Sequence, residues 1–433
     1  MRISMTRWSV SVLGLLLGAF QVQADSLMSL DQALREHDTQ VQRASQSVLV
    51  SEARSDQARA QLGPQVQLSA SANQTERRQL GLNQRFLGED YGITLSQPIF
   101  DRPRALESDR IEALTERAVA GESRILQERR LELLQAFAEW VEALEHQRLL
   151  EERSQNLTQR RTQVARLFER QRVSITELLT VENELERVQV ELVSTQATQA
   201  RAESSILNLT GLDVNLDWLP RPATESWSFA DLQSNASDDM THPALREARA
   251  TLEAALLALR QADGRSLPTL SAQLGVRHTN IGANDTETAP VDTYTARLTL
   301  SWLLYDSGDR DARVREADLL VRDAELGLME VERELQRQSA TLDAELKRAE
   351  AAWRAAKAER DSARKLVEAA NRSFDVGVGD LGDSLVALDR LIDAEMRVSS
   401  TWLSGLLAAA QIAENREQLN EATMRTLSNL VAP

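Results

Sequence analysis

The two halves of this 433-residue chain repeat a single pattern. Each half contains a proline that opens an alternating polar and apolar segment, a Leu-Ser pair that closes a second such segment, and a phenylalanine near a helix break. These anchors are Pro64 with Pro268, Leu95 with Leu300 and Phe168 with Phe374, at offsets of 204, 205 and 206 residues. Because the offset drifts by only one residue from anchor to anchor, we infer a duplicated structural unit, in place of the unrelated domains that length alone suggests.

The duplication predicts the same order of elements in each half: helix, strand, long loop, strand, very long helix, short break and helix. The first repeat has strands near 65–73 and 91–97 and long helices that run to 210, and the second has strands near 269–277 and 294–302. We divide the chain into a signal peptide at 1–24, a first repeat at 25–212, a linker at 213–242, a second repeat at 243–424 and a C-terminal tail at 425–433.

The four strand segments alternate polar and apolar residues over about the 9 to 11 residues that a tilted membrane strand needs. One face suits lipid and the other suits water, although a soluble sheet with one buried face would show the same alternation. Tyr91, Tyr294 and Trp302 lie at strand ends, where membrane barrels collect aromatic residues. Four strands cannot close a barrel, since the smallest membrane barrels have about 8, so an oligomer must supply the remainder.

The helix after each second strand is very long. Residues 104–172 contain no proline and one glycine, and roughly 69 residues at 1.5 Å each span on the order of 100 Å. Apolar residues recur at spacings of three, four and seven, as in Leu150, Leu157 and Val164, which indicates coiled-coil packing between neighbouring helices. Asp101 in the first half and Asp306 in the second provide helix start signals.

The N-terminal residues have the pattern of a signal peptide. Arg2 and Arg7 precede an apolar stretch at 10–20 and a small-residue cleavage site that ends at Ala24. This stretch is shorter than the about 20 residues of a transmembrane helix, and no later segment reaches that length without charges. We therefore expect an exported protein that would enter a membrane only as a β-barrel.

Composition excludes several classes of function. The chain has no cysteine, which rules out a disulfide framework, a thiolate metal site and a cysteine nucleophile. The net charge is −16, and removal of the two signal-peptide arginines makes the mature chain −18, a balance that repels phosphate backbones. We expect no nucleic-acid partner, no cofactor and no metal site.

Taken together, these patterns resemble the TolC family of outer-membrane efflux proteins over essentially the whole mature chain. The resemblance is carried by the duplicated order of elements, by residues 95–101 and 300–306 before the long helices, and by the turn at 374–380 before a Leu-rich helix. It implies a mainly α fold with a membrane β-barrel portion. In this fold each chain of a homotrimer gives four strands to a 12-stranded β-barrel that is continuous with a periplasmic α-helical barrel.

The resemblance also implies a function and a location. The protein would lie in the outer membrane of a Gram-negative bacterium, with most of the chain in the periplasm. It would give passive exit, in efflux or type I secretion, to substrates delivered by an inner-membrane pump of the RND, ABC or MFS type and a periplasmic adaptor (membrane fusion) protein. The sequence leaves open the cargo, the pump and adaptor, and whether the tunnel rests open or closed.

In the TolC family the two helix-to-helix breaks face the adaptor and form the periplasmic entrance. The resemblance therefore implies gating carboxylates at Glu177, Asp380 and Asp383, and adaptor contacts at Val173, Ser174, Ile175, Val376, Gly377, Val378 and Gly379. Three-fold symmetry would gather the carboxylates into rings that select cations or bind a plugging ion. The same acids would equally complement the dipole of a helix N-terminus. Gly379 and Gly382 depart from the family pattern and put a salt-bridge latch at this end in doubt.

Other motifs support no competing function. Residues 377–382 fit the dinucleotide fingerprint G-x-G-x-x-G, but a helix and not a strand precedes them. The four histidines have no spacing that resembles a metal site or a catalytic triad. We therefore predict that the protein is not an enzyme. The alternative is a structural or adhesive coiled-coil rod anchored in the outer membrane, which would need neither a second strand pair nor a returning helix in each half.

Overall fold

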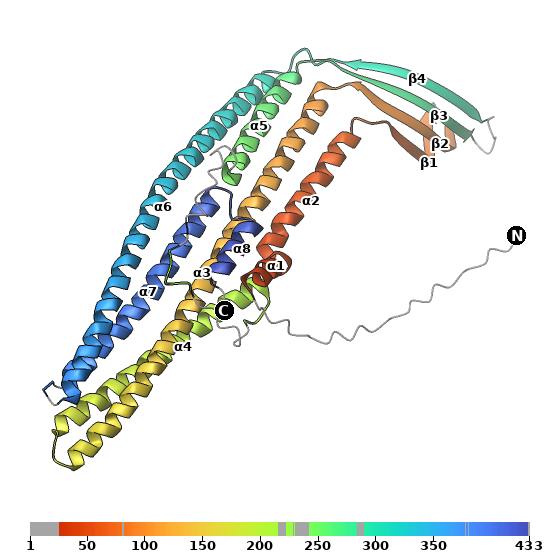
Figure 1. Ribbon diagram of the computed structural model, residues 1–433. Helices are drawn as coiled ribbons and strands as arrows, with labels where there is room; N and C mark the ends of the chain where they lie inside the picture. The colour runs from red at the N-terminus through yellow and green to blue at the C-terminus, as the bar shows by residue number, and fades with distance from the viewer. Residues whose placement is uncertain are drawn as a thin grey trace, which may run out of the picture.

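The computed structural model describes residues 26–79, 82–214, 222–227, 229, 242–283, 290–376, 378–379 and 381–431. They form an elongated, curved body with a four-stranded sheet at one end and two helix-to-helix turns at the other (Figure 1). The signal peptide expected at 1–24 and much of the linker expected at 213–242 lie outside the described residues.

Each half of the chain contributes a similar series of elements. The first half contains α1 (Leu27–His37), α2 (Thr39–Ala60), β1 (Gln65–Gln79), β2 (Leu82–Phe100), α3 (Arg102–Glu169) and α4 (Ile175–Thr210). The second half contains α5 (Pro243–Gly264), β3 (Thr269–Ala283), β4 (Val291–Ser301), α6 (Asp309–Asp375), α7 (Leu381–Asn415) and α8 (Glu421–Leu430). The prediction of strand pairs followed by very long helices is confirmed.

Four local predictions differ from the structure. The strands are longer than predicted, because pairing continues beyond the segment in which polar and apolar residues alternate. In the first half β1 ends at Gln79 and β2 begins at Leu82, so the long loop expected between them is wrong. The first helix is broken into α1 and α2 at Asp38, whose extended backbone ends one helix while its side chain accepts from Gln40 N at 2.9 Å and caps the next. The expected C-terminal tail at 425–433 is largely the last turns of α8.

Local capping explains where the two longest helices begin. Asp101 is the N-cap of α3, and its Oδ1 accepts from Arg104 N at 3.0 Å, with proline in the first turn. In α6 the N-cap is Gly308 at φ 90°, a left-handed conformation that glycine adopts without strain. Asp306 supports this turn, since its carboxylate accepts from Gly308 N and Arg310 N.

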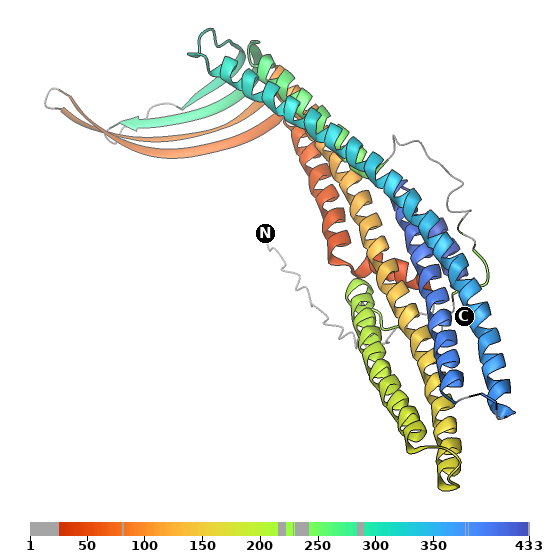
Figure 2. The same cartoon turned by 90° about the vertical axis from the view of Figure 1, so that its left-hand side faces the viewer.

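The sheet is antiparallel in the order β1-β2-β3-β4, so β1 and β4 are its edges. It leaves the helical body at an angle and curves away from it (Figure 2). No described helix combines the length and the apolar character required to cross a bilayer.

The main core lies midway along the body, where α1, α3, α4, α7 and α8 meet. Trp140 and Trp402 are fully buried there. Arg130 of α3, also buried, binds the Asp31 carboxylate of α1 through two nitrogens at 2.7 and 3.0 Å and donates to Leu419 O at 2.7 Å. The helices next to both chain ends are thereby fixed to the long helix that supports the sheet.

Candidate functional site

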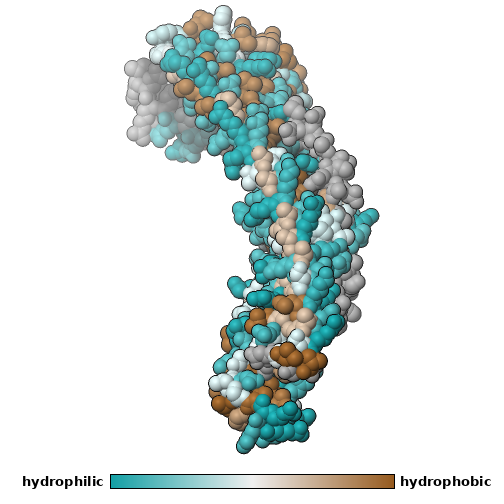
Figure 3. Space-filling model, turned by 60° about the vertical axis from the view of Figure 1, so that its left-hand side comes forward, coloured by the Kyte–Doolittle hydropathy of each residue, from teal (hydrophilic) through white to brown (hydrophobic). Residues whose placement is uncertain are grey.

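One face of the sheet is apolar and exposed to solvent. Register places Leu68, Ile93, Val276 and Tyr294 in one row across all four strands, with exposed fractions of 74, 53, 48 and 77%. The next row is Val66, Leu95, Leu274 and Ala296. A soluble sheet buries such a face, so rows of exposed apolar residues indicate an apolar surrounding or a partner. In Figure 3 brown, apolar side chains stand among teal ones at this end of the molecule and occur again near the opposite end.

A change of residue type marks the outer limit of the apolar rows. The next row on the same face contains Tyr91, His278 and Asp292. The rings of Tyr91 and His278 stack at a centroid distance of 4.7 Å, and His278 Nδ1 lies 2.7 Å from Asp292 Oδ1. Aromatic and polar side chains therefore replace aliphatic ones at one level across three strands. This is the arrangement found where membrane barrels pass from hydrocarbon to headgroups.

The opposite face of the sheet is mainly polar, with Val291 near one end of β4 as an apolar exception. Its rows include Gln67, Thr94, Gly275 and Thr295, and Gln65, Ser96, Gln273 and Arg297. Such a face suits contact with water. The charged residues on this face are Asp90, Arg277 and Arg297, counted over strand residues 65–76, 87–100, 269–280 and 290–301.

The turn between α3 and α4 contains four of the predicted site residues. Ser174 is the N-cap of α4 and forms a capping box with Glu177, in which Ser174 N and Glu177 Oε1 lie 3.3 Å apart. Ile175 is 48% exposed, whereas Val173 packs against the apolar cluster between the helices. Glu177 is thus a half-buried carboxylate with a local capping role, and a ring of such carboxylates would need further copies of the chain.

The turn between α6 and α7 lies at the same end of the molecule as the turn between α3 and α4 (Figures 1 and 2). Val376 and Val378 are 74 and 85% exposed. At Gly379 an added Cβ would lie 2.8 Å from the Ser373 side chain, so only glycine fits this close turn. Asp383 is exposed in the first turn of α7. The remaining predicted positions, Gly377 and Asp380, lie outside the described residues.

A buried arginine, Arg153, joins the two helix hairpins above these turns. Its side chain on α3 is 2% exposed and lies 2.5 Å from Asp389 of α7, 3.4 Å from Glu184 and 3.7 Å from Glu191 of α4. Burial raises the pKa of the Asp389 carboxyl, and the arginine opposes that rise. The guanidinium of Arg153 therefore links its own helix, α3, to both α4 and α7.

A second arginine, Arg160, makes a similar junction two turns further along α3. It donates to Ser384 Oγ of α7 at 2.6 Å and lies 4.7 Å from the centroid of the Phe374 ring of α6. Neither arginine was predicted as a site residue. The signal that would have found them is the heptad pattern itself, because Arg153 and Arg160 stand in the apolar seam between Leu150, Leu157 and Val164.

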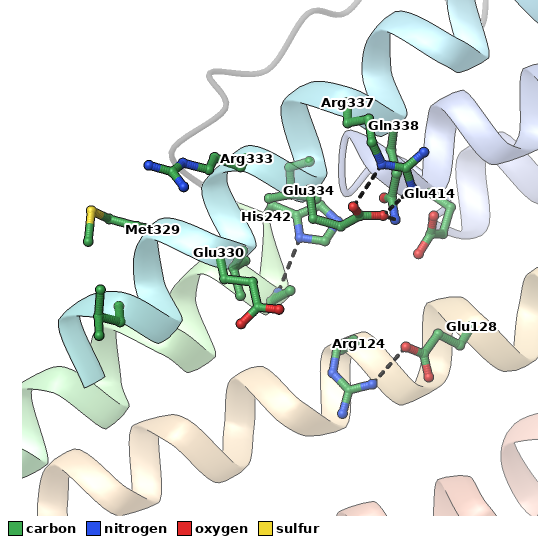
Figure 4. Close-up of a pocket in the computed structure, with 14 residues that line it drawn as sticks. Arg124, Glu128, His242, Met329, Glu330, Arg333, Glu334, Arg337, Gln338 and Glu414 are labelled. Atoms are coloured by element: carbon green, nitrogen blue, oxygen red, sulfur yellow. Dashed lines mark hydrogen bonds and ion pairs between the residues drawn. The ribbon is translucent and has the colours of Figure 1, made fainter. Parts of the chain in front are cut away.

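A cavity of about 820 Å³ lies between α3, α5, α6 and α7 (Figure 4). Two ion pairs lie in its wall: Arg124 pairs with Glu128 at 2.7 Å, and Arg337 pairs with Glu334. Burial and the nearby Glu128 raise the pKa of the Glu414 carboxyl in its wall. No cluster of His, Cys, Asp and Glu suited to a metal ion occurs among the residues that the structure describes.

The sequence of the second half matches a known family. Residues 240–423 fit the family model described as outer membrane efflux protein. No curated protein sequence matches the chain.

Solved structures share the fold over nearly the whole chain. The outer-membrane channel OprN has a TM-score of 0.76 at 18% identity, covering 91% of this chain and 90% of that one. The CmeC outer membrane channel of Campylobacter jejuni has a TM-score of 0.77 at 14% identity, covering 100% and 98%. The open state of the MtrE outer membrane channel of Neisseria gonorrhoeae has a TM-score of 0.76 at 15% identity, covering 92% and 90%. The chain therefore has the fold of these channels.

Proposed function

We propose that this chain, whose residues 240–423 belong to the outer membrane efflux protein family, is one protomer of a homotrimeric channel that gives solutes passive exit through the outer membrane. Each protomer contributes its four strands to a 12-stranded barrel and its long helices to a periplasmic tunnel. An inner-membrane pump and a periplasmic adaptor deliver the cargo. The chain forms the wall of the channel and catalyses no reaction.

The observation that carries this proposal is the exposed apolar face of the sheet. Leu68 and Tyr294 lie on the two edge strands and are 74 and 77% exposed, so the apolar rows extend to both edges. In hydrocarbon each edge strand must find a partner for its backbone groups. If three copies join β4 of one protomer to β1 of the next, the edges disappear, the apolar faces meet lipid and the polar faces line a water-filled lumen.

The helices supply length for crossing the periplasm. Helix α6 has 67 residues, which at 1.5 Å each extend about 100 Å. Each long helix is followed by an antiparallel partner, α4 after α3 and α7 after α6. Such hairpins, repeated around a three-fold axis, form a hollow helical wall, whereas a solid rod needs no returning helices. This feature favours a tunnel over the alternative of an adhesive or structural rod.

The turns at the far end are the proposed entrance. Val376 and Val378 present exposed apolar side chains there, which suit contact with an adaptor. Together with Val173, Ser174, Ile175, Gly377 and Gly379 they form the proposed adaptor-contact set. Glu177, Asp380 and Asp383 would form rings of carboxylates around the entrance in the trimer.

The test is the conductance of the purified mature protein in planar bilayers, with the mass of the oligomer determined in the same detergent. A trimer that opens discrete channels supports the proposed function. A monomer, or an oligomer that never conducts, overturns it and favours the rod.

A further inference from the structure

We propose that Arg297 forms a ring of positive charge that attracts anions in the lumen of the barrel, at the level where the strands join the helical body. This inference rests on the proposed function, because the ring exists only when three chains close a barrel. It concerns the opposite end of the molecule from the carboxylates at the helix turns.

Strand register places Arg297 on the polar face of β4. Its row across the sheet contains Gln273 of β3, Ser96 of β2 and Gln65 of β1. Arg297 is the one charged residue in this row of four. Its neighbours in the strand, Ala296 and Leu298, belong to the apolar face. The arginine therefore points to the side that the proposed barrel encloses.

Arg297 differs from the other arginine on this face. Arg277 Nη1 lies 4.0 Å from Asp90 Oδ1, and Asp90 Oδ2 also accepts from Ser71 Oγ at 2.9 Å. That positive charge is balanced within the sheet. Within the described part of the chain, Arg297 makes no ion pair or hydrogen bond.

The neighbouring protomer would not neutralise Arg297. In the closed ring β4 faces β1 of the next chain, and the lumen face of β1 carries Gln65, Gln67, Ser69, Ser71, Asn73 and Thr75, with no carboxylate. The first acid on that strand, Glu76, alternates onto the other face. Over strand residues 65–76, 87–100, 269–280 and 290–301 the lumen therefore has a net charge of one positive unit per protomer, from Arg277, Arg297 and Asp90.

The dimensions of the barrel make this charge effective. Twelve strands spaced about 4.8 Å apart and tilted about 40° enclose a radius of roughly 12 Å. An extended arginine side chain reaches about half of that distance. The three guanidiniums thus lie within about one Debye length of the axis at 0.1 M salt, where they enrich a monovalent anion about threefold. The enrichment rises with the charge of the anion, so multiply charged anions such as sulfate and phosphate compounds gain most.

The experiment measures the ratio of chloride to potassium permeability from the reversal potential of single channels under a KCl gradient. We expect Arg297→Gln to lower this ratio about two- to threefold and Arg297→Lys to preserve it. Arg297→Glu should lower the ratio further. The matched control is the double variant Asp90→Asn with Arg277→Gln, which removes a balanced pair and should leave the ratio unchanged.

The outcomes separate the two proposals. If Arg297→Gln and Arg297→Glu both form channels with the chloride-to-potassium permeability ratio of the unaltered protein, the proposal of an arginine ring is wrong and the proposed channel function is still supported. If the unaltered protein opens no channels, the proposed function and the ring both fall. An equal change in the control variant would also overturn the ring, because it would show that net lumen charge does not govern the ratio.

Discussion

Arg153 of α3 and Asp389 of α7 form an ion pair of 2.5 Å that joins the two halves of the chain near their helix turns. Glu184 and Glu191 add α4 to the same guanidinium. The pairs that link the helices elsewhere at this end, such as Arg161 with Glu182, are more exposed. The relative position of the two helix hairpins therefore depends strongly on one buried side chain.

Replacing Arg153 by Met is expected to loosen α7 from α3 and α4. The variant leaves three carboxylates close together with only the exposed Arg187 to balance them. Loss of one partner of a buried pair costs about 3–5 kcal/mol, and we expect about 1–3 here because the carboxylates are partly solvated. Thermal unfolding in detergent measures the loss. The matched control is Arg187→Met, whose side chain contacts the same acids but is 55% exposed and should change stability little. Equal losses in the two variants would contradict the role of Arg153.

Replacing Glu414 by Gln is expected to change how stability depends on pH. Burial and Glu128 raise the pKa of the Glu414 carboxyl in the folded protein above its value in the unfolded chain. At pH values between these two pKa values, the folded state therefore binds more protons than the unfolded state. Its free energy of unfolding therefore falls as the pH rises through the folded pKa, and the penalty is absent below the unfolded pKa.

The prediction is a higher melting temperature for Glu414→Gln than for the unaltered protein at pH 8, with the difference vanishing near pH 4. Circular dichroism at both pH values checks it. Glu421→Gln, at an exposed position on α8, serves as the control and should show no such divergence. A difference that is the same at both pH values would argue against a buried carboxylate at position 414.

The entrance carboxylates are tested by Glu177→Gln combined with Asp383→Asn. Glutamine at 177 keeps the capping box, because its amide oxygen can still accept from Ser174 N, so the substitution removes charge without removing the cap. We expect weaker block of single channels by divalent cations and an unchanged melting temperature. Unchanged block would remove both residues from the pore and leave Glu177 with its local role alone.

The proposed adaptor contact is tested by Val376→Asp combined with Val378→Asp. Both side chains are exposed in the single chain, so the substitutions should preserve folding and trimer formation. Burying two carboxylates in an apolar contact should reduce adaptor affinity by at least about tenfold. Site-specific crosslinking to the adaptor measures this, with Val378→Ala as the milder control. Normal crosslinking of the aspartate variant would refute the placement of the contact.

The sequence by itself determined the local elements and their duplication. Period-two alternation identified the strands and the helical spacing identified the long helices, because both depend on residues that are neighbours along the chain. The cap at Asp101 was likewise readable, since a helix start is fixed within four residues. The ends of the strands could not be predicted from the sequence. Beyond Asn73 both faces of β1 are polar, and only its pairing with β2 extends the strand to Gln79.

Only the tertiary structure decided which distant residues meet. The heptad seam placed Leu150 and Leu157 inside a helix interface, but it could not show that Arg153 between them meets Asp389 of the other half. It likewise could not show that Arg297 shares a row with Gln65, or that Asp90 lies beside Arg277. Periodicity assigns a residue to a face of its own element, whereas charge pairing depends on the register and packing of elements far apart in the chain, which the folded structure fixes.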